Sequence, residues 1–349
     1  MMGCLFFEMI IFNAMFSKSN GGLEQTFLNY IPTLEASGHH VIPIIHPLAP
    51  IKDSCPQVNL IKVFNFNQFD VIAIYKLRKL IKKNRPDCII THSHRAAYLF
   101  NKTLSKVPKI AVCHVKGNYN FGSDAIIAIT EHMRQDIIAS GWGANKVFTV
   151  PNMLQIPAHL EYRPPRDTNI PVLGICARFS PIKGVDVFIN ALAELKKRGI
   201  AFKAKIAGDG PEKGNYTQLI ARLGLQEEVR LLGWIDDKQA FYQQIDIFCL
   251  PSREESFGLV ILESMLYSLP MVLCALPGPK EVIGQSQSAL FVPADDVLKM
   301  ADGLQCLIED KNYAKELSMK AFQQVKNYSS AQIAKVLDNV LQTVIQYRA

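Results

Sequence analysis

The sequence predicts an α/β fold divided into two domains. Three observations support this prediction: the chain has 349 residues, apolar strand-like runs alternate with helical patterns along most of it, and a proline-rich stretch interrupts the alternation near the middle. At about 100 to 200 residues per domain, this length suits two domains. Apolar residues make up 49% of the chain, which is enough for two hydrophobic cores.

Short apolar runs define the expected strands of the first half. They lie at 5–11, 41–45, 88–91, 109–113, 125–129 and 147–150. Prolines at positions 151, 157, 164, 165 and 171 oppose regular structure and predict an interdomain linker. The alternation of strands and helices restarts at Val172. We therefore expect domains at 1–165 and 166–328, followed by an amphipathic helix within 329–349.

Cysteine usage and the first residues bear on the cellular compartment. The eight cysteines are scattered, form no C-x-x-C pair and lie partly inside apolar runs, which is typical of buried thiols in a reduced compartment. The first 16 residues are apolar but contain Glu8 and Asn13 and have no basic start, which favours a strand over a signal peptide. No apolar run reaches the roughly 18 residues of a membrane-spanning helix. We expect a cytoplasmic protein.

Positive charge is concentrated in the first half of the chain. Residues 1–165 hold 17 Lys and Arg against 10 Asp and Glu, whereas 166–349 hold 21 of each. The densest part is one predicted helix with the basic residues Lys76, Arg78, Lys79, Lys82, Lys83 and Arg85. Its opposite face is expected to carry Ile72, Ile74, Leu77, Leu80 and Ile81.

A basic amphipathic helix can dock a protein on an anionic membrane, at about 1 kcal/mol per nearby Lys or Arg. The alternative is an ordinary solvated helix face. Nucleic acid is not an expected partner, because the basic strip lacks interleaved aromatic residues and the chain has no nucleic-acid-binding motif.

Two acids, Glu255 and Glu263, separated by seven residues, are the most informative feature of the second half. The apolar run 245–250 leads into a glycine-containing turn, and open α/β folds bind ligands where strands end. A helix is expected next, and its first N–H groups, which lack intrahelical partners, favour an anion. They belong to Phe257, Gly258, Leu259 and Val260. Two hydroxyl acceptors beside an anion site suit a sugar joined through phosphate to a ribose. The alternative makes Glu255 a helix cap and Glu263 a surface residue.

A basic loop, 177–184, follows the apolar run that starts at Val172. Arg178 can bind a phosphate as a planar fork and Lys183 as a point charge, while Gly184 allows close backbone approach. A solvated basic loop is the alternative. The sequence thus offers cations and acids at the ends of two neighbouring strand patterns.

Taken in order, these pieces resemble the retaining glycosyltransferases of family 4. The resemblance covers nearly the whole chain, and the ordered set is far more specific than any single motif. The matching segments are Gly21-Gly-Leu-Glu24, Ser37-Gly-His-His40, the His114 segment, Val150-Pro-Asn152, the Arg178 and Lys183 loop, Gly208-Asp-Gly-Pro211, Leu232-Gly-Trp234, the stretch from Pro251 to Glu263, Gly278-Pro-Lys-Glu-Val-Ile283 and Leu290-Phe-Val-Pro-Ala-Asp295. Two departures are the absent second glycine after Gly278 and Ser256 in place of a glycine.

The resemblance implies the GT-B fold, with two facing Rossmann-like domains, an interdomain cleft and a last helix that crosses back to the first domain. It implies that Glu263 binds the donor ribose, that Glu255 binds hydroxyls of the transferred sugar, and that His114 hydrogen-bonds the donor sugar. The alternative for His114 is a core or loop histidine with a purely structural role. Gly21 and Gly22 would let backbone N–H groups approach the diphosphate or the acceptor. Without a third ligand, His92 and His94 favour acceptor contact or structure over a metal site.

The expected activity is retaining transfer of a hexose-type sugar from a nucleotide-diphosphate sugar, with no cofactor. Arg178, Lys183 and the helix N–H groups would stabilise the leaving diphosphate in place of a metal ion, and the chain has no D-x-D sequence. The basic first domain and the habits of the family favour a lipid-linked or lipopolysaccharide glycan as acceptor, at the inner face of the cell membrane. The alternatives are a nucleotide-sugar 2-epimerase of the same fold and a catalytically silent nucleotide-sugar-binding protein.

Overall fold

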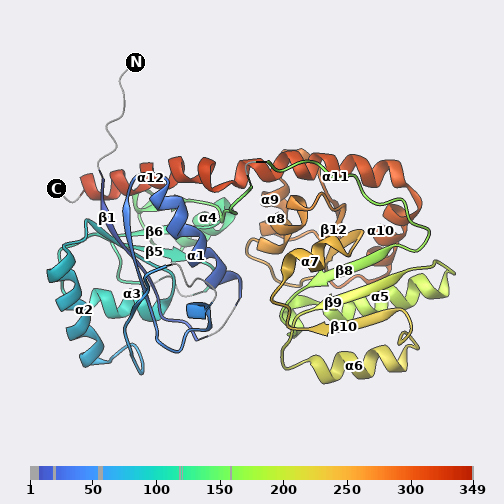
Figure 1. Ribbon diagram of the computed structural model, residues 1–349, viewed down its shortest axis with the longest axis horizontal. Helices are drawn as coiled ribbons and strands as arrows, with labels where there is room; N and C mark the ends of the chain where they lie inside the picture. The colour runs from blue at the N-terminus through green and yellow to red at the C-terminus, as the bar shows by residue number, and fades with distance from the viewer. Residues whose placement is uncertain are drawn as a thin grey trace, which may run out of the picture. The chain divides into compact units, whose positions relative to one another are not determined.

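The computed structural model describes residues 8–18, 21–53, 58–117, 119, 121–157 and 159–347. The chain divides into two compact units, one formed by Met1–Gln155 with Tyr328–Ala349 and the other by Ile156–Asn327. Each unit contains one parallel sheet with helices packed against it (Figure 1). The boundary falls after Gln155, so the proline-rich segment from Pro157 onward belongs to the second unit, and the last helix belongs to the first.

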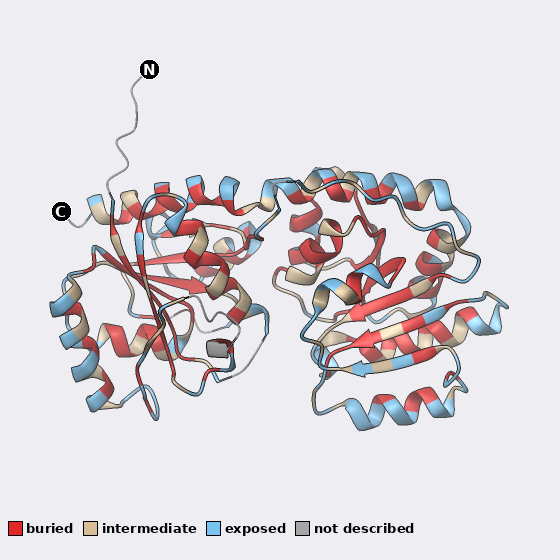
Figure 2. Ribbon diagram, in the orientation of Figure 1, coloured by how far each residue is buried: buried red, intermediate tan, exposed pale blue. Residues whose placement is uncertain are grey.

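The first unit has a seven-stranded parallel sheet in the order β3-β2-β1-β4-β5-β6-β7. Its strands are β1 Ile10–Met15, β2 His40–Ile45, β3 Ile61–Lys62, β4 Cys88–Thr91, β5 Lys109–Cys113, β6 Ala125–Ala128 and β7 Val147–Thr149. Its helices are α1 Gly22–Glu35, α2 Val71–Asn84, α3 His94–Asn101, α4 Glu131–Ala139 and α12 Ser330–Gln346. The inner strands are buried on both faces, which explains their uninterrupted apolar sequences (Figure 2).

Helix starts in this unit follow short polar side chains. Asp70 accepts hydrogen bonds from the Ile72 and Ala73 amides, both at 3.0 Å, and so caps α2. Ser93 caps α3 and Thr130 caps α4 in the same way. Helices α2 and α3 pack on one face of the sheet through a core that includes Leu77 and Phe100.

Helix α12 is joined to the first unit by a buried polar contact. His39 Nε2 lies 2.9 Å from Asp338 Oδ1, and both side chains are almost fully buried. The helix also packs along α1, and Leu154 forms a bridge with Ser329 just before α12 begins. The final amphipathic pattern is therefore a core element of the first unit.

The second unit has a six-stranded parallel sheet in the order β10-β9-β8-β11-β12-β13. Its strands are β8 Val172–Cys176, β9 Lys203–Ala207, β10 Val229–Gly233, β11 Ile247–Leu250, β12 Met271–Cys274 and β13 Leu290–Val292. Its helices are α5 Val185–Lys197, α6 Lys213–Arg222, α7 Lys238–Gln243, α8 Leu259–Leu266, α9 Pro277–Ile283, α10 Val297–Glu309 and α11 Lys311–Val325. Its core gathers α5, α6 and α10 against the sheet, and α11 packs on α8.

The sequence placed most strands well and the first one poorly. Strands β4, β5 and β8 have their expected bounds, and β2, β6, β7 and β11 differ by one or two residues. Strand β1 begins at Ile10 and ends at Met15, so the expected strand at 5–11 was wrong in its bounds, and residues 5–7 lie outside the described residues. The apolar run is longer than the strand, so periodicity alone could not place the strand within it.

Candidate active site

The candidate site of the second unit lies where its strand order reverses. From β8 the chain adds β9 and β10 on one side, and then places β11 on the other side of β8. The loops that follow β8 and β11 therefore diverge at the carboxyl ends of two adjacent strands, which is where open α/β sheets bind ligands. These loops carry Arg178, Lys183 and Glu255.

Two glycines let the β8 loop pack backbone against backbone on the loops that follow β11 and β9. Gly184 has φ 62°, and a Cβ there would lie 2.0 Å from the carbonyl oxygen of Pro251. Gly208 has φ 133°, and its Cβ would lie 1.8 Å from the carbonyl oxygen of Ala177. Any side chain would force the loops apart. Gly184 thus allows close approach of the β11 loop, while its predicted role beside a phosphate stays a prediction.

Arg253 fixes the two loops together. Its guanidinium donates to both carboxylate oxygens of Asp186, at 2.9 and 2.7 Å, and to Asp295 at 2.8 Å. Asp186 starts α5, directly after the basic loop, and Arg253 precedes Glu255. Because a bidentate contact constrains orientation as well as distance, this arginine sets the position of Glu255 relative to Lys183.

Lys183 and Glu255 form an ion pair. Lys183 Nζ lies 2.7 Å from Glu255 Oε2, and the two side chains are 24% and 14% exposed. Glu255 is not a helix cap, because Gly258 occupies the start of α8 and no side chain caps that helix. Arg178 is exposed, and its guanidinium has no hydrogen bond or ion pair with any residue that the structure describes. The loop therefore offers one paired cation and one cation available to a ligand.

Helix α8 directs free amide groups to the same place. It begins at Leu259 rather than near Phe257, and Gly258 before it is buried with φ 89°. Within the described part of the chain, the N–H groups of Leu259 and Val260 have no hydrogen-bond partner. Such groups carry partial positive charge and suit an anion. Phe257 is buried and belongs to the packing of the turn.

Glu263 is buried, which contradicts the surface-residue alternative. It is 8% exposed, and its carboxylate accepts hydrogen bonds from Lys238 Nζ at 2.6 Å and from the Tyr242 hydroxyl at 2.7 Å. Both partners lie on α7. A buried carboxylate held by two donors has a fixed position and can accept further hydrogen bonds through its remaining lone pairs.

The protonation states around Glu263 follow from burial and charge. Burial alone would lower the pKa of Lys238, but the charge and hydrogen bond of Glu263 outweigh it and raise that pKa. Burial, with the Glu263 charge, raises the pKa of Tyr242. Burial raises the pKa of Cys176 to about 12, with Glu263 contributing. Lys238 therefore stays charged, Tyr242 stays a donor, and Cys176 stays a thiol rather than a nucleophile.

The first unit also gathers polar groups where its strand order reverses, at the ends of β1 and β4. Gly21 and Gly22 start α1, exposed, after β1. His92 follows β4 and is 1% exposed, and His114 follows β5 half-buried. The two histidines meet, with His92 Nδ1 3.2 Å from His114 Nε2. His94 instead stacks on Phe121, with ring centroids 4.4 Å apart.

Sequence reasoning missed the residues that hold the acids and histidines in place. Lys238 and Tyr242 were not candidates, because nothing in the α7 sequence indicates a carboxylate partner. Arg253 was passed over although it lies in the acid motif. Asn13, whose side chain contacts His92 at 2.8 Å, was noted only as a polar residue in an apolar run. A buried polar residue within an apolar strand was the one signal that could have identified it.

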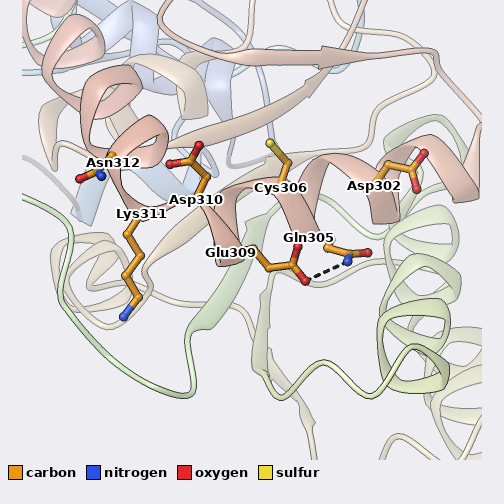
Figure 3. Close-up of a pocket in the computed structure, with 7 residues that line it drawn as sticks. All are labelled: Asp302, Gln305, Cys306, Glu309, Asp310, Lys311 and Asn312. Carbon is orange, nitrogen blue, oxygen red and sulfur yellow. Dashed lines mark hydrogen bonds between the residues drawn. The ribbon is translucent and has the colours of Figure 1, made fainter.

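A surface hollow at the junction of α10 and α11 is not part of this arrangement (Figure 3). Three of its polar or charged side chains already have partners: Asp302 accepts from Arg198 at 2.9 Å, Glu309 accepts from Gln305 at 2.9 Å, and Lys311 pairs with Asp167. The hollow is thus explained by helix packing.

No helix within the described residues is both long and apolar enough to cross a membrane.

Two family models match the chain in tandem. The model described as Glycosyltransferase Family 4 matches residues 20–155, and the model described as Glycosyl transferases group 1 matches residues 162–324. The two matches fall on the first and second units respectively. Together they span most of the chain.

Individual proteins show the same likeness. A lipopolysaccharide core biosynthesis glycosyltransferase, LpsE, of Rhizobium meliloti is 25% identical over 86% of this chain and 89% of its own length. A poly(ribitol-phosphate) alpha-N-acetylglucosaminyltransferase of Staphylococcus aureus is 24% identical over 75% of this chain, which spans 56% of that enzyme. The crystal structure of Anabaena HepE with UDP-glucose matches with a TM-score of 0.84 at 20% identity, over 96% of this chain and 100% of HepE.

Proposed function

The chain belongs to the glycosyltransferases of family 4, and we propose that it moves a hexose-type sugar from a nucleotide-diphosphate sugar to a lipid-linked or lipopolysaccharide glycan, with retention. Its two Rossmann-like parallel sheets have the GT-B fold. One observation carries the proposal: a buried carboxylate, a lysine–glutamate pair and free helix amides come together beside the strand-order reversal of the second unit.

Each of these groups suits one part of a nucleotide-sugar donor. The Glu263 carboxylate is proposed to accept hydrogen bonds from the ribose hydroxyls. Arg178, Lys183 and the Leu259 and Val260 amides would bind the diphosphate. Glu255 would accept hydroxyls of the transferred sugar. UDP and UDP-glucose in HepE, a structure of the same fold, support this class of donor.

The proposed reaction needs no base from the protein. The bond between the anomeric carbon and the diphosphate oxygen breaks, and the acceptor oxygen bonds to that carbon on the same face. The acceptor proton passes to the departing phosphate oxygen. What the protein must supply is positive charge where negative charge grows, and preorganised cations and amides do this without reorganising. In the first unit, Gly21 and Gly22 would place α1 amides near a substrate anion, and His114 would contact a sugar hydroxyl.

Incubation with a panel of nucleotide-diphosphate sugars tests the activity. Release of nucleoside diphosphate that depends on added membrane glycan extract, with label recovered in the glycan, is the expected result. An isomerised nucleotide sugar without glycan labelling would favour the 2-epimerase. Binding without turnover of any donor would favour a silent binding protein. The anomeric configuration of the product, read by NMR, decides whether transfer is retaining.

Chelation should leave transfer largely intact, because the proposed mechanism takes its cations from Arg178 and Lys183. No group of three or more His, Cys, Asp or Glu side chains suited to a metal ion occurs among the described residues. The measurement is the initial rate after dialysis against EDTA and after adding back magnesium or manganese. A rate that collapses and recovers with metal would contradict this mechanism.

The first unit carries a surface suited to an anionic membrane, and we propose peripheral attachment at the inner face of the cell membrane. The α2 lysines are exposed. Next to them, five apolar or aromatic side chains are 57% to 74% exposed: Phe66, Phe69, Val71, Ile72 and Tyr75. The expectation that Ile72 lies on the inward face was wrong, because the buried face of α2 runs through Ala73, Leu77 and Ile81, and Ile72 lies off that face. Exposed apolar residues beside basic ones are typical of interfacial helices.

Attachment of this kind should depend on charge and salt. Reversal of Lys79, Lys82 and Lys83 to Glu should release the protein from anionic vesicles, and binding by the parent should weaken as salt rises, because charges are screened beyond about 10 Å at 0.1 M. Reversal of Lys197, Lys299 and Lys315 in the second unit changes the net charge equally and should not release it. Vesicle co-sedimentation measures both. If both triple variants bound the vesicles equally well, the positive charge of α2 would be assigned to solubility instead.

A further inference from the structure

The histidines at the ends of β4 and β5 belong to a chain of hydrogen bonds whose direction can be read from its first member. Asn13, in β1, is fully buried. Its Nδ2 lies 3.1 Å from the carbonyl oxygen of Phe27. A carbonyl can only accept, so the amide nitrogen of Asn13 must face it, and Asn13 Oδ1 must point the other way as an acceptor.

This orientation fixes the proton on His92. Asn13 Oδ1 lies 2.8 Å from His92 Nε2, so that nitrogen must donate. A neutral imidazole carries one N–H, and His92 Nδ1 is then an acceptor. The contacts of its two nitrogens set the orientation of the ring, and Phe27 and Tyr30 pack edge to face against it with ring centroids 5.7 and 4.6 Å away.

The position of the proton on His114 follows from its contact with His92. Its Nε2 lies 3.2 Å from His92 Nδ1 and must supply the proton of that contact. His114 Nδ1 is left with a lone pair and has no hydrogen-bond partner among the described residues. Burial lowers the pKa of His92 and lowers that of His114 to about 4, so both rings are neutral at physiological pH.

We propose that Asn13 and His92 are positioning residues that hold His114 in the tautomer whose Nδ1 accepts a hydrogen bond, so that this site takes a sugar hydroxyl and rejects acceptor-only groups such as phosphate oxygens. The proposal deepens the sugar-transfer function and rests on it for the identity of the ligand. The proton order itself does not, because it follows from contacts inside the first unit.

The proton order is tested by NMR on ligand-free protein with 15N-labelled histidine. The expected signature is a 15N–15N coupling across the hydrogen bond between His92 Nδ1 and His114 Nε2, with the shared proton attached to His114. A proton attached to His92 Nδ1 would overturn the proposal. This arm needs no donor, so its outcome is independent of whether sugar transfer is found.

The hydroxyl preference is tested with deoxy and deoxyfluoro donor analogues at each ring position. Fluorine accepts weakly but cannot donate, so at the position facing His114 both analogues should lose kcat/KM equally, by about 5- to 10-fold, the value of one neutral hydrogen bond. A fluoro analogue that keeps most of the rate at every sensitive position would mean that His114 donates, contrary to the proposal.

Two substitutions at His92 separate positioning from packing. His92→Phe keeps a ring against Phe27 and Tyr30 but removes both nitrogens, and should lose the discrimination between parent and deoxy sugar. His92→Gln should restore it, because its amide can donate to Asn13 and accept from His114. His132→Phe, a change on α4 away from the network, is the matched control and should behave as the parent. Retained discrimination in folded His92→Phe would overturn the positioning role, and if that variant does not fold, the NMR and analogue series on the parent still decide.

Discussion

Replacing Glu263 with Gln should weaken nucleoside diphosphate binding by about tenfold or more, because a charge-assisted hydrogen bond is roughly twice as strong as a neutral one. The carboxylate is buried and already oriented by Lys238 and Tyr242. The amide of Gln has a single acceptor oxygen, so it cannot accept from both Lys238 and Tyr242 as the carboxylate does. Calorimetry with the best nucleoside diphosphate from the donor panel measures the loss.

The ligand itself provides the sharpest control. A 2′,3′-dideoxynucleoside diphosphate lacks the hydroxyls that Glu263 is proposed to bind, so the parent and the Glu263→Gln variant should bind it with similar affinity. An equal loss for both nucleotides would mean that the substitution disturbs the site as a whole. Unchanged affinity for the normal nucleotide would remove Glu263 from the donor site. Glu316→Gln, an exposed change on α11, serves as the matched surface control.

The fold was predictable because the strands are buried on both faces. A short apolar run such as β4 or β5 suits the middle of a parallel sheet that helices cover on both faces. The polar residues that follow the run mark where the strand ends. Strand β1 shows the limit, because its apolar run extends beyond the strand and Asn13 lies inside it. Strand order is not encoded locally, and the family resemblance implied only that the domains are Rossmann-like.

The sequence predicted which loops carry the candidate site residues, but it did not predict which of those residues contact each other. The glycines and charged residues after β8 and β11 indicated two loops that contact each other in the structure. The partner of Lys183 is 72 residues away, and the pair forms because Gly184 packs against the Pro251 backbone. Glu263 meets Lys238 and Tyr242 through the packing of α7 on α8, and His92 meets Asn13 across adjacent strands. Each contact depends on tertiary register, which residue types and spacing do not specify.

Lys183 and Arg178 should both be needed for turnover, and Lys183 should matter more. Removing one preorganised donor to a developing negative charge costs about 10²- to 10³-fold in rate. Arg178→Ala removes a cation that has no partner among the described residues. Lys183→Ala removes a cation and also leaves the carboxylate of Glu255 without its 2.7 Å partner beside the proposed diphosphate. The unpaired carboxylate would repel the leaving group, so the expected fall in kcat is larger at this position.

A double-mutant cycle separates these two effects. If repulsion from unpaired Glu255 adds to the loss of the cation, combining Lys183→Ala with Glu255→Gln should recover part of kcat, although Glu255→Gln alone lowers it. Measuring kcat at saturating donor concentration removes differences in donor affinity from the comparison. Thermal melting confirms that each variant is folded. Lys320→Ala breaks a comparable 2.6 Å pair with Glu316 on α11 and should leave kcat unchanged. Full activity in both Arg178→Ala and Lys183→Ala would show that the leaving diphosphate is stabilised elsewhere, and the α8 amides would then remain as its only proposed ligands in the second unit.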